Sequence, residues 1–156
     1  MIASTHLYRI NEIKLIKDVP FHTHTQTEIV YVLKGDCEIE IETLPWKRDG
    51  KPGDLFILPA LMPHNQINRK ETTTLCWVLK TDQIDMHKPL YLSFAPKSVK
   101  GNLIYRWAND LHQLEKSNSA EKLLDSFLIS ILELIKQEIS ILGTFSPPIN
   151  ATKNYI

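Results

Sequence analysis

Three histidines and one glutamate lie in two short stretches of the chain, and their side chains are of the kind that binds metal ions. His22 and His24 are two residues apart, Glu28 follows four positions later, and His64 belongs to the second stretch. Imidazole nitrogens and carboxylate oxygens suit a divalent first-row metal such as Fe, Mn, Ni or Zn. These four residues are therefore the candidate metal ligands.

A shared metal requires the chain to turn back between the histidines and the glutamate. On a straight strand, which rises about 3.3 Å per residue, His22 and Glu28 would stand about 20 Å apart. Metal–nitrogen and metal–oxygen bonds are only about 2 Å long. We therefore expect a reversal at residues 25–27, and we expect His64 to arrive from a second, proline-flanked hairpin.

Two metal-free arrangements of these side chains remain open. They can line a pocket for an organic ligand, or they can hydrogen-bond one another below the mouth of a barrel. A ligand pocket has apolar walls and a few polar groups that fix orientation. The candidate ligand-binding residues are His22, His24, Glu28, Tyr31, His64 and Asn68. No residue is assigned a catalytic role, and a divalent metal is the one cofactor considered.

The first two thirds of the chain have the pattern of short strands separated by Gly and Pro turns. Residues 28–33 are nearly all apolar and rich in β-branched side chains, which predicts a central strand buried on both faces. Residues 37–42 alternate between inward-facing apolar side chains and outward-facing glutamates. The remaining expected strands are 8–10, 12–16, 54–58 and 73–79, with a hairpin turn at Asp49-Gly50. Several short strands with regular turns indicate a β-barrel or sandwich.

After Pro96 the apolar residues recur at helical spacing. One helix is expected around residues 103–114, and a second carries an apolar stripe over residues 124–142, with Asn118 and Glu121 as its capping pair. Both helices can simply pack on the barrel wall. The stripe is wider than one contact needs, which favours a second contact with another copy of the chain. The expected dimer-interface residues are Leu124, Leu128, Ile131 and Ile135.

Composition narrows the class of protein. The 156 residues carry a formal net charge of zero, which argues against nucleic-acid binding by this segment itself. Cys37 and Cys76 lie in strand-like runs without metal-binding spacing, so we expect buried, reduced thiols in a cytoplasmic protein. No signal peptide and no apolar run of about 20 residues is present, so no membrane partner is expected.

Three segments resemble the sensor domain of AraC-type transcription regulators, whose barrels are cupins. The segments are residues 28–35 (EIVYVLKG), 52–59 (PGDLFILP) and 63–64 (PH). Two positions depart from the cupin pattern, because Ile16 and Leu61 stand where many cupins have Gly. The resemblance implies a mostly β fold, a cupin-like double-stranded β-helix (jelly-roll) barrel followed by two C-terminal α-helices.

The resemblance also implies a function and a division of the chain. Residues 1–96 would form the effector-binding barrel, residues 97–144 a helical dimerisation segment, and residues 145–156 a linker and the start of a helix-turn-helix region. The expected protein is the sensing domain of a bacterial regulator with no enzymatic activity. Its partners would be a small-molecule effector such as a sugar, a second copy of itself, and DNA only through a region beyond Ile156.

A different class of protein stays open beside this one. A stand-alone metal-dependent cupin enzyme, of dioxygenase or sugar isomerase type, would use His22, His24, Glu28 and His64. This alternative explains the four metal-ligating side chains at least as well as the regulator does. It gives less reason for the long pair of helices.

Overall fold

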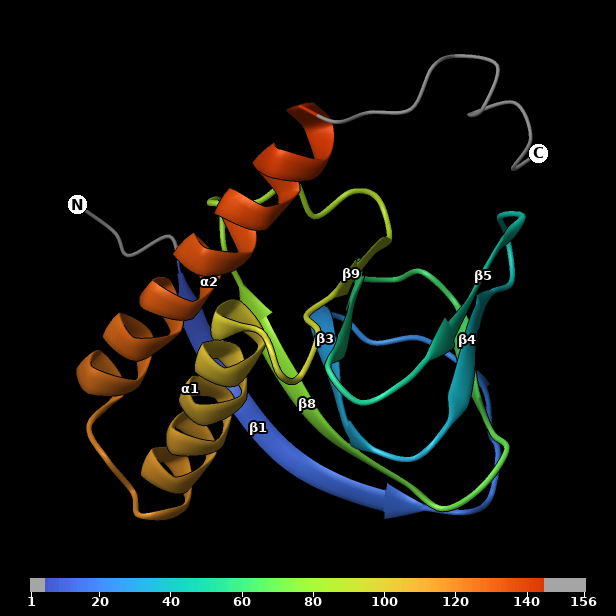
Figure 1. Ribbon diagram of the computed structural model, residues 1–156, viewed down its shortest axis with the longest axis horizontal. Coiled ribbons are helices and arrows are strands. Elements are labelled where there is room, and N and C mark those ends of the chain that lie inside the picture. The colour runs from blue at the N-terminus through green and yellow to red at the C-terminus, as the bar shows by residue number, and fades with distance from the viewer. Residues whose placement is uncertain (1–4, 145–156) are drawn as a thin grey trace.

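The computed structural model describes residues 5–144 as two antiparallel β-sheets followed by two helices (Figure 1). The larger sheet has the strand order β1-β8-β3-β6-β9, and the smaller sheet has the order β2-β7-β4-β5. The strands are β1 (His6–Leu15), β2 (Val19–His22), β3 (Thr27–Lys34), β4 (Cys37–Ile41), β5 (Trp46–Gly50), β6 (Asp54–Leu58), β7 (His64–Asn68), β8 (Thr72–Lys80) and β9 (Leu90–Ser93). The fold is mostly β and agrees with a jelly-roll cupin barrel, as predicted.

Apolar side chains form two cores, one on each face of the larger sheet. The inner core fills the space between the two sheets and includes Val30, Val32, Ile39 and Phe56. The outer core lies between the larger sheet and the helices α1 (Val99–Lys116) and α2 (Glu121–Thr144), which cover that sheet beside β1 (Figure 1). One face of the larger sheet thus lines the barrel, and its other face packs against the two helices.

Strand β3 contributes to both cores. It lies between β8 and β6, and its first six residues are buried, which confirms the predicted central strand. Because side chains alternate along a strand, Val30 and Val32 enter the inner core while Ile29 and Tyr31 enter the outer one. This alternation decides which residues of β3 can meet the histidines.

The predicted hairpin turn at Asp49-Gly50 is wrong. Both residues belong to β5, which pairs with β4 so that Gly50 faces Cys37. A Cβ atom at Gly50 would lie 2.8 Å from the Sγ atom of Cys37, so this glycine permits close packing inside a strand. The connection between the two strands instead lies at residues 42–45.

The helices begin and end close to the predicted positions. Ser98 caps α1, because its hydroxyl oxygen accepts a hydrogen bond of 2.9 Å from the backbone N–H of Gly101. Asn118 has the left-handed φ of 57° and its N–H bonds the carbonyl of Glu115, so it ends α1. The prediction that Asn118 caps the second helix is therefore wrong.

The predicted dimer-interface residues lie inside the protein. Leu124, Leu128, Ile131 and Ile135 are all buried, and all four pack into the outer core of their own chain. Leu128, Ile131 and Ile135 have no accessible surface and cannot contact a partner, so the structure corrects the assignment at these three positions, whereas Leu124 is 9% exposed. The wide apolar stripe of α2 is explained by packing on the barrel and on α1. The homodimer itself stays a prediction.

The two thiols are buried, as the sequence indicated. Cys37 and Cys76 are free, and burial in apolar surroundings raises the pKa of each thiol to about 12. No helix among the described residues has both the length and the apolar character needed to cross a membrane. The segment predicted to begin a DNA-binding region, residues 145–156, lies outside the described residues.

Candidate functional site

Four side chains that are distant in sequence meet at one end of the barrel. One ligand atom from each of His22, His24, Glu28 and His64 lies within 4.8 Å of the corresponding atoms of the others. His22 is the last residue of β2 and pairs with His64, the first residue of β7. The chain reverses between β2 and β3, within residues 23–26, which brings Glu28 back to the histidines as predicted.

Backbone hydrogen bonds orient two of the imidazoles. Nδ1 of His22 lies 2.8 Å from the carbonyl of Pro20, and Nδ1 of His64 lies 3.0 Å from the carbonyl of Met62. A carbonyl only accepts hydrogen bonds, so each Nδ1 carries the proton and each Nε2 keeps a free lone pair. This is the arrangement in which histidine binds a metal through Nε2.

Two ring nitrogens of the cluster are buried without a hydrogen-bond partner in the described part of the chain, Nε2 of His24 and Nε2 of His64. They lie 3.5 and 3.3 Å from the carboxylate oxygens of Glu28, but the geometry does not make a hydrogen bond. Buried polar atoms are rarely left unpaired. The two unpaired nitrogens are therefore suited to bind a cation between them and Glu28.

The electrostatics of the cluster favour a cation. The side chain of Glu28 is 11% exposed, and within residues 5–144 it forms ion pairs only with His24 and His64. Burial lowers the pKa of His24 against the opposing field of Glu28, and the neighbouring His22 and His64 lower it further. The ring of His24 is thus favoured in its neutral form, which is the form in which an imidazole binds a metal ion.

The size of the cluster fits a metal ion. With metal–ligand bonds of about 2.1 Å, two ligands on opposite sides of an ion stand about 4.2 Å apart. The separations of up to 4.8 Å in the cluster are close to this value. The donor set of three imidazoles and one carboxylate is chemically suited to a divalent first-row metal.

The cluster opens onto a cavity of about 210 Å³ inside the barrel. Its walls are mostly apolar and come from both sheets: Ile13, Leu15, Val19, Val30, Ile39 and Leu58. The sequence did not identify these residues, nor the polar lining residues Asn65, Gln66, Thr74 and Cys76. Inward alternation on β1 and β8 is the signal that could have found some of them.

Two predicted site residues lie elsewhere. Tyr31 lines a different cavity, because it sits on the face of β3 opposite to Glu28 and Val30. The amide nitrogen of Asn68 donates to the carbonyl of Lys17, and its amide oxygen accepts from Gln66. Neither residue belongs with the histidines, so the structure corrects the predicted pocket at these two positions.

The turn before the second histidine motif has an unusual backbone. Leu61 has φ 63°, in the left-handed region, and its N–H donates to the carbonyl of His24 over 2.8 Å. This is one of the two positions where many cupins have Gly. Glycine suits a left-handed backbone, whereas leucine does not. The bond to His24 ties the turn directly to the cluster.

Residues 14–79 match the family model of the Cupin domain. Among curated proteins, the chain is similar to a 3-hydroxyanthranilate 3,4-dioxygenase of Bacillus cereus (strain ATCC 10987 / NRS 248), with 42% identity over 98 residues. That match covers 51% of this chain and 55% of the relative. A protein of the same name from Bacillus thuringiensis (strain Al Hakam) is 42% identical over 48 residues, covering 29% of this chain and 27% of the relative.

A solved structure supports the fold. The protein YhaK from Escherichia coli superposes with a TM-score of 0.52 at 14% identity, covering 64% of this chain and 52% of its own. At this identity the similarity concerns the fold alone.

These comparisons change the prediction made from the sequence. The sequence led us to expect no enzymatic activity. That expectation is wrong, because the curated relatives are named as dioxygenases. The cupin part of the resemblance is confirmed, whereas its regulator and DNA-binding parts find no support. Residues 14–79, less than half of the chain, are similar to the Cupin domain, and the two sheets of the structure agree with that fold.

Proposed function

We propose that this chain is a metal-dependent cupin oxygenase that acts on a small aromatic substrate. The observation that carries the proposal is the convergence of His22, His24, Glu28 and His64, with two buried Nε2 atoms that have no partner among the described residues. Three imidazoles with one carboxylate leave positions free on a six-coordinate ion, as oxygenase iron sites require. When bound, iron would supply the chemistry with O2 that protein side chains lack.

The residues of the chain divide the remaining tasks. His22, His24, Glu28 and His64 would hold the ion in the wall of the cavity. The apolar walls from β1, β3, β4 and β6 exclude water and accept the face of a ring. Gln66 and Thr74 are among the polar groups of the cavity wall that can orient substituents on that ring.

The cavity favours a substrate with a single ring. Its volume of about 210 Å³ is small for a ligand pocket, and its lining is mostly apolar. The curated relatives are named for 3-hydroxyanthranilate, which has one aromatic ring. The chain spans about half the length of the first of these relatives, so this substrate is a proposal for the chain and 3-hydroxyanthranilate is the first compound to test.

The experiment combines metal analysis with oxygen uptake. Protein purified without chelator is loaded anaerobically with Fe(II), and O2 consumption is measured after adding 3-hydroxyanthranilate. We expect near-stoichiometric iron and substrate-dependent uptake, and we expect both to disappear in Glu28→Gln, which keeps the shape of the side chain. Tyr8→Phe, a change on the exposed part of β1, serves as the matched control.

Two results would contradict the proposal in different ways. A folded protein that takes up no metal shows that the cluster is not a metal site. A protein that binds iron and consumes no O2 with this compound shows that the site is not an oxygenase for this substrate. The regulator hypothesis has no comparable observation in its favour, since its predicted interface residues are buried in the chain's own core.

A further inference from the structure

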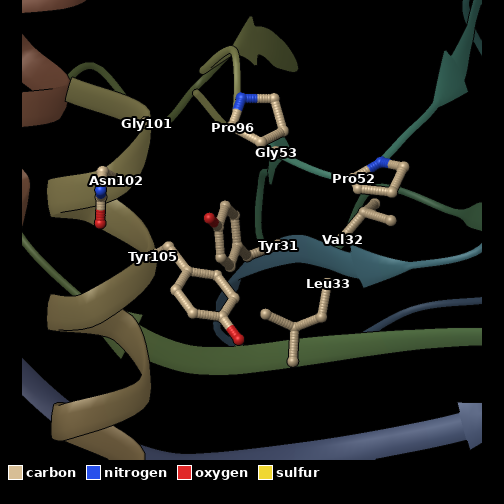
Figure 2. A pocket seen from close by; sticks show the side chains of 9 residues that line it. All are labelled: Tyr31, Val32, Leu33, Pro52, Gly53, Pro96, Gly101, Asn102 and Tyr105. Atoms are coloured by element: carbon tan, nitrogen blue, oxygen red, sulfur yellow. The ribbon is translucent and has the colours of Figure 1, made fainter. Parts of the chain in front are cut away.

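A second cavity of about 260 Å³ lies on the other side of β3, between the barrel and α1 (Figure 2). Its walls come from β3, the turn before β6, the segment before α1, and the first turns of α1. The lining residues are Tyr31, Val32, Leu33, Pro52, Gly53, Pro96, Gly101, Asn102 and Tyr105. The cavity shares no lining residue with the one that holds the histidines.

A tyrosine hydroxyl that makes no hydrogen bond within the described part of the chain faces this cavity. Tyr31 is 2% exposed, and Figure 2 shows its ring beside that of Tyr105, with both side chains in the space next to α1. No hydrogen bond in the described part of the chain involves the Tyr31 hydroxyl, and its oxygen is not among the fully buried polar atoms, so it is reached from the cavity. A hydrogen-bond acceptor placed in the cavity can therefore receive this donor.

Backbone contacts fix the position of one wall of the cavity. Gly53 has φ 94°, its N–H donates to the carbonyl of Val32, and its own carbonyl accepts from the N–H of Phe94. A Cβ atom at Gly53 would lie 2.3 Å from the Phe94 oxygen, so the turn and the segment before α1 are already in close contact. The cavity is thus preformed, as small-molecule sites generally are.

The chemistry of the lining defines the ligand. No lining residue is charged, and most of the wall is apolar. Burial, together with the nearby Tyr105, raises the pKa of Tyr31 to about 12, so its hydroxyl remains a donor at neutral pH. Asn102 and the half-exposed Tyr105 line the cavity from α1.

We propose that this cavity binds a small neutral molecule with one ring and a carbonyl-type acceptor, which receives the hydrogen bond of the Tyr31 hydroxyl. A charged ligand has no counter-charge among the lining residues, and a purely apolar one leaves the hydroxyl unpaired. The inference does not depend on the proposed oxygenase activity, because the two cavities lie on opposite faces of the larger sheet.

The test uses acetophenone as the probe and isopropylbenzene, a ring of similar size without an acceptor, as its control. Binding to the whole chain without metal is followed by two-dimensional NMR. We expect acetophenone to bind at least threefold more tightly than isopropylbenzene, with shifts at Tyr31 and along α1. Tyr31→Phe should weaken acetophenone binding about three- to tenfold, the range of one hydrogen bond, and abolish the preference for it.

Two further variants make the result decisive. Asn102→Trp, at an exposed position of α1, should fill the cavity and remove binding of both probes, whereas Tyr8→Phe should bind like the unchanged protein. Thermal unfolding confirms that each variant is folded. Equal binding of the two probes, equal acetophenone binding by Tyr31→Phe and the unchanged protein, or shifts confined to the residues around His64 would each overturn the proposal.

Discussion

Strand β3 separates two cavities that differ in the chemistry of their unpaired groups. On the barrel side, Nε2 atoms of His24 and His64 meet the carboxylate of Glu28. On the helix side, the hydroxyl of Tyr31 faces an uncharged, mostly apolar wall. The first set offers lone pairs and suits a cation, whereas the second offers an O–H group and suits an acceptor. The unpaired group in each cavity thus indicates the class of ligand.

The comparison also shows how one strand serves both sites. Glu28 and Tyr31 are three residues apart, and the alternation of side chains places them on opposite faces of the sheet. A change on one face of β3 should therefore affect one ligand and spare the other. The following predictions test that separation, in order of decreasing effect.

The largest effect is expected for His64→Ala. The substitution removes the buried Nε2 atom of His64, the candidate metal ligand. In the unchanged protein the ring is held in place by the hydrogen bond from its Nδ1 to the carbonyl of Met62. We expect the bound metal to fall from near one equivalent to less than about a tenth, because the remaining groups no longer surround the ion. Elemental analysis after dialysis measures this, and Tyr31→Phe is the control that should keep its metal. Full metal retention in His64→Ala would mean that the ligands lie elsewhere.

A smaller effect, on stability, is expected for Gly53→Ala. The added Cβ would meet the Phe94 oxygen at 2.3 Å, and alanine would be forced to adopt φ 94°. We expect the free energy of unfolding to fall by about 2–4 kcal/mol, measured by urea denaturation. Metal binding by the protein that remains folded should be unchanged. An equal loss of metal affinity would show that the two cavities are coupled and would break the comparison.

The third prediction concerns alkaline pH. The pKa of Tyr31 is raised from 10.0 to about 12 by burial, so above pH 10 the unfolded chain loses this proton before the folded chain does. Stability should therefore fall as the pH rises from 10 towards 12, and the fall should be shallower in Tyr31→Phe. Urea denaturation at several pH values measures the slopes. The thiols of Cys37 and Cys76 also have raised pKa values, but both proteins contain them, so their effect cancels. Equal slopes would mean that the Tyr31 hydroxyl is hydrated.

The sequence predicted the residues of the candidate metal cluster better than those of the other cavity. Spacing and side-chain chemistry pointed to His22, His24, Glu28 and His64 as candidate ligands of a metal or of an organic molecule, and the structure brings all four together. Tyr31 was assigned to the same pocket because the alternation along β3 was not applied to it. The outer cavity itself could not be predicted, since it depends on where α1 packs against the barrel.

The helices show the same limit of sequence reasoning. Periodicity correctly predicted an apolar stripe on α2, but it cannot say which surface covers that stripe. Leu128 and Ile131 pack on the chain's own outer core, so the stripe is wide because it contacts both α1 and the larger sheet. The prediction of a turn at Asp49-Gly50 was wrong for a related reason. Gly50 is needed for close packing against Cys37 within the barrel, and not for a turn.

The smallest effect is expected for Leu61→Gly, which restores the residue that many cupins have in this turn. Leu61 holds φ 63° and is 69% exposed, so its side chain gains little from burial while its backbone is strained. A non-glycine residue in the left-handed conformation destabilises the folded state by about 1–2 kcal/mol, and glycine removes this cost. Glycine also has more conformational freedom in the unfolded chain, which offsets about half of the gain in stability.

We therefore expect Leu61→Gly to raise the free energy of unfolding by about 0.5–1 kcal/mol, measured by urea denaturation. Asn118→Gly is the matched control, because Asn118 has a similar φ of 57° but asparagine tolerates it, so its gain should be smaller. The hydrogen bond from residue 61 to the carbonyl of His24 should persist, and metal affinity should not fall. A loss of metal affinity in Leu61→Gly would instead show that the stiffer leucine backbone holds His24 in place, and the departure from the cupin pattern would then serve the inner cavity.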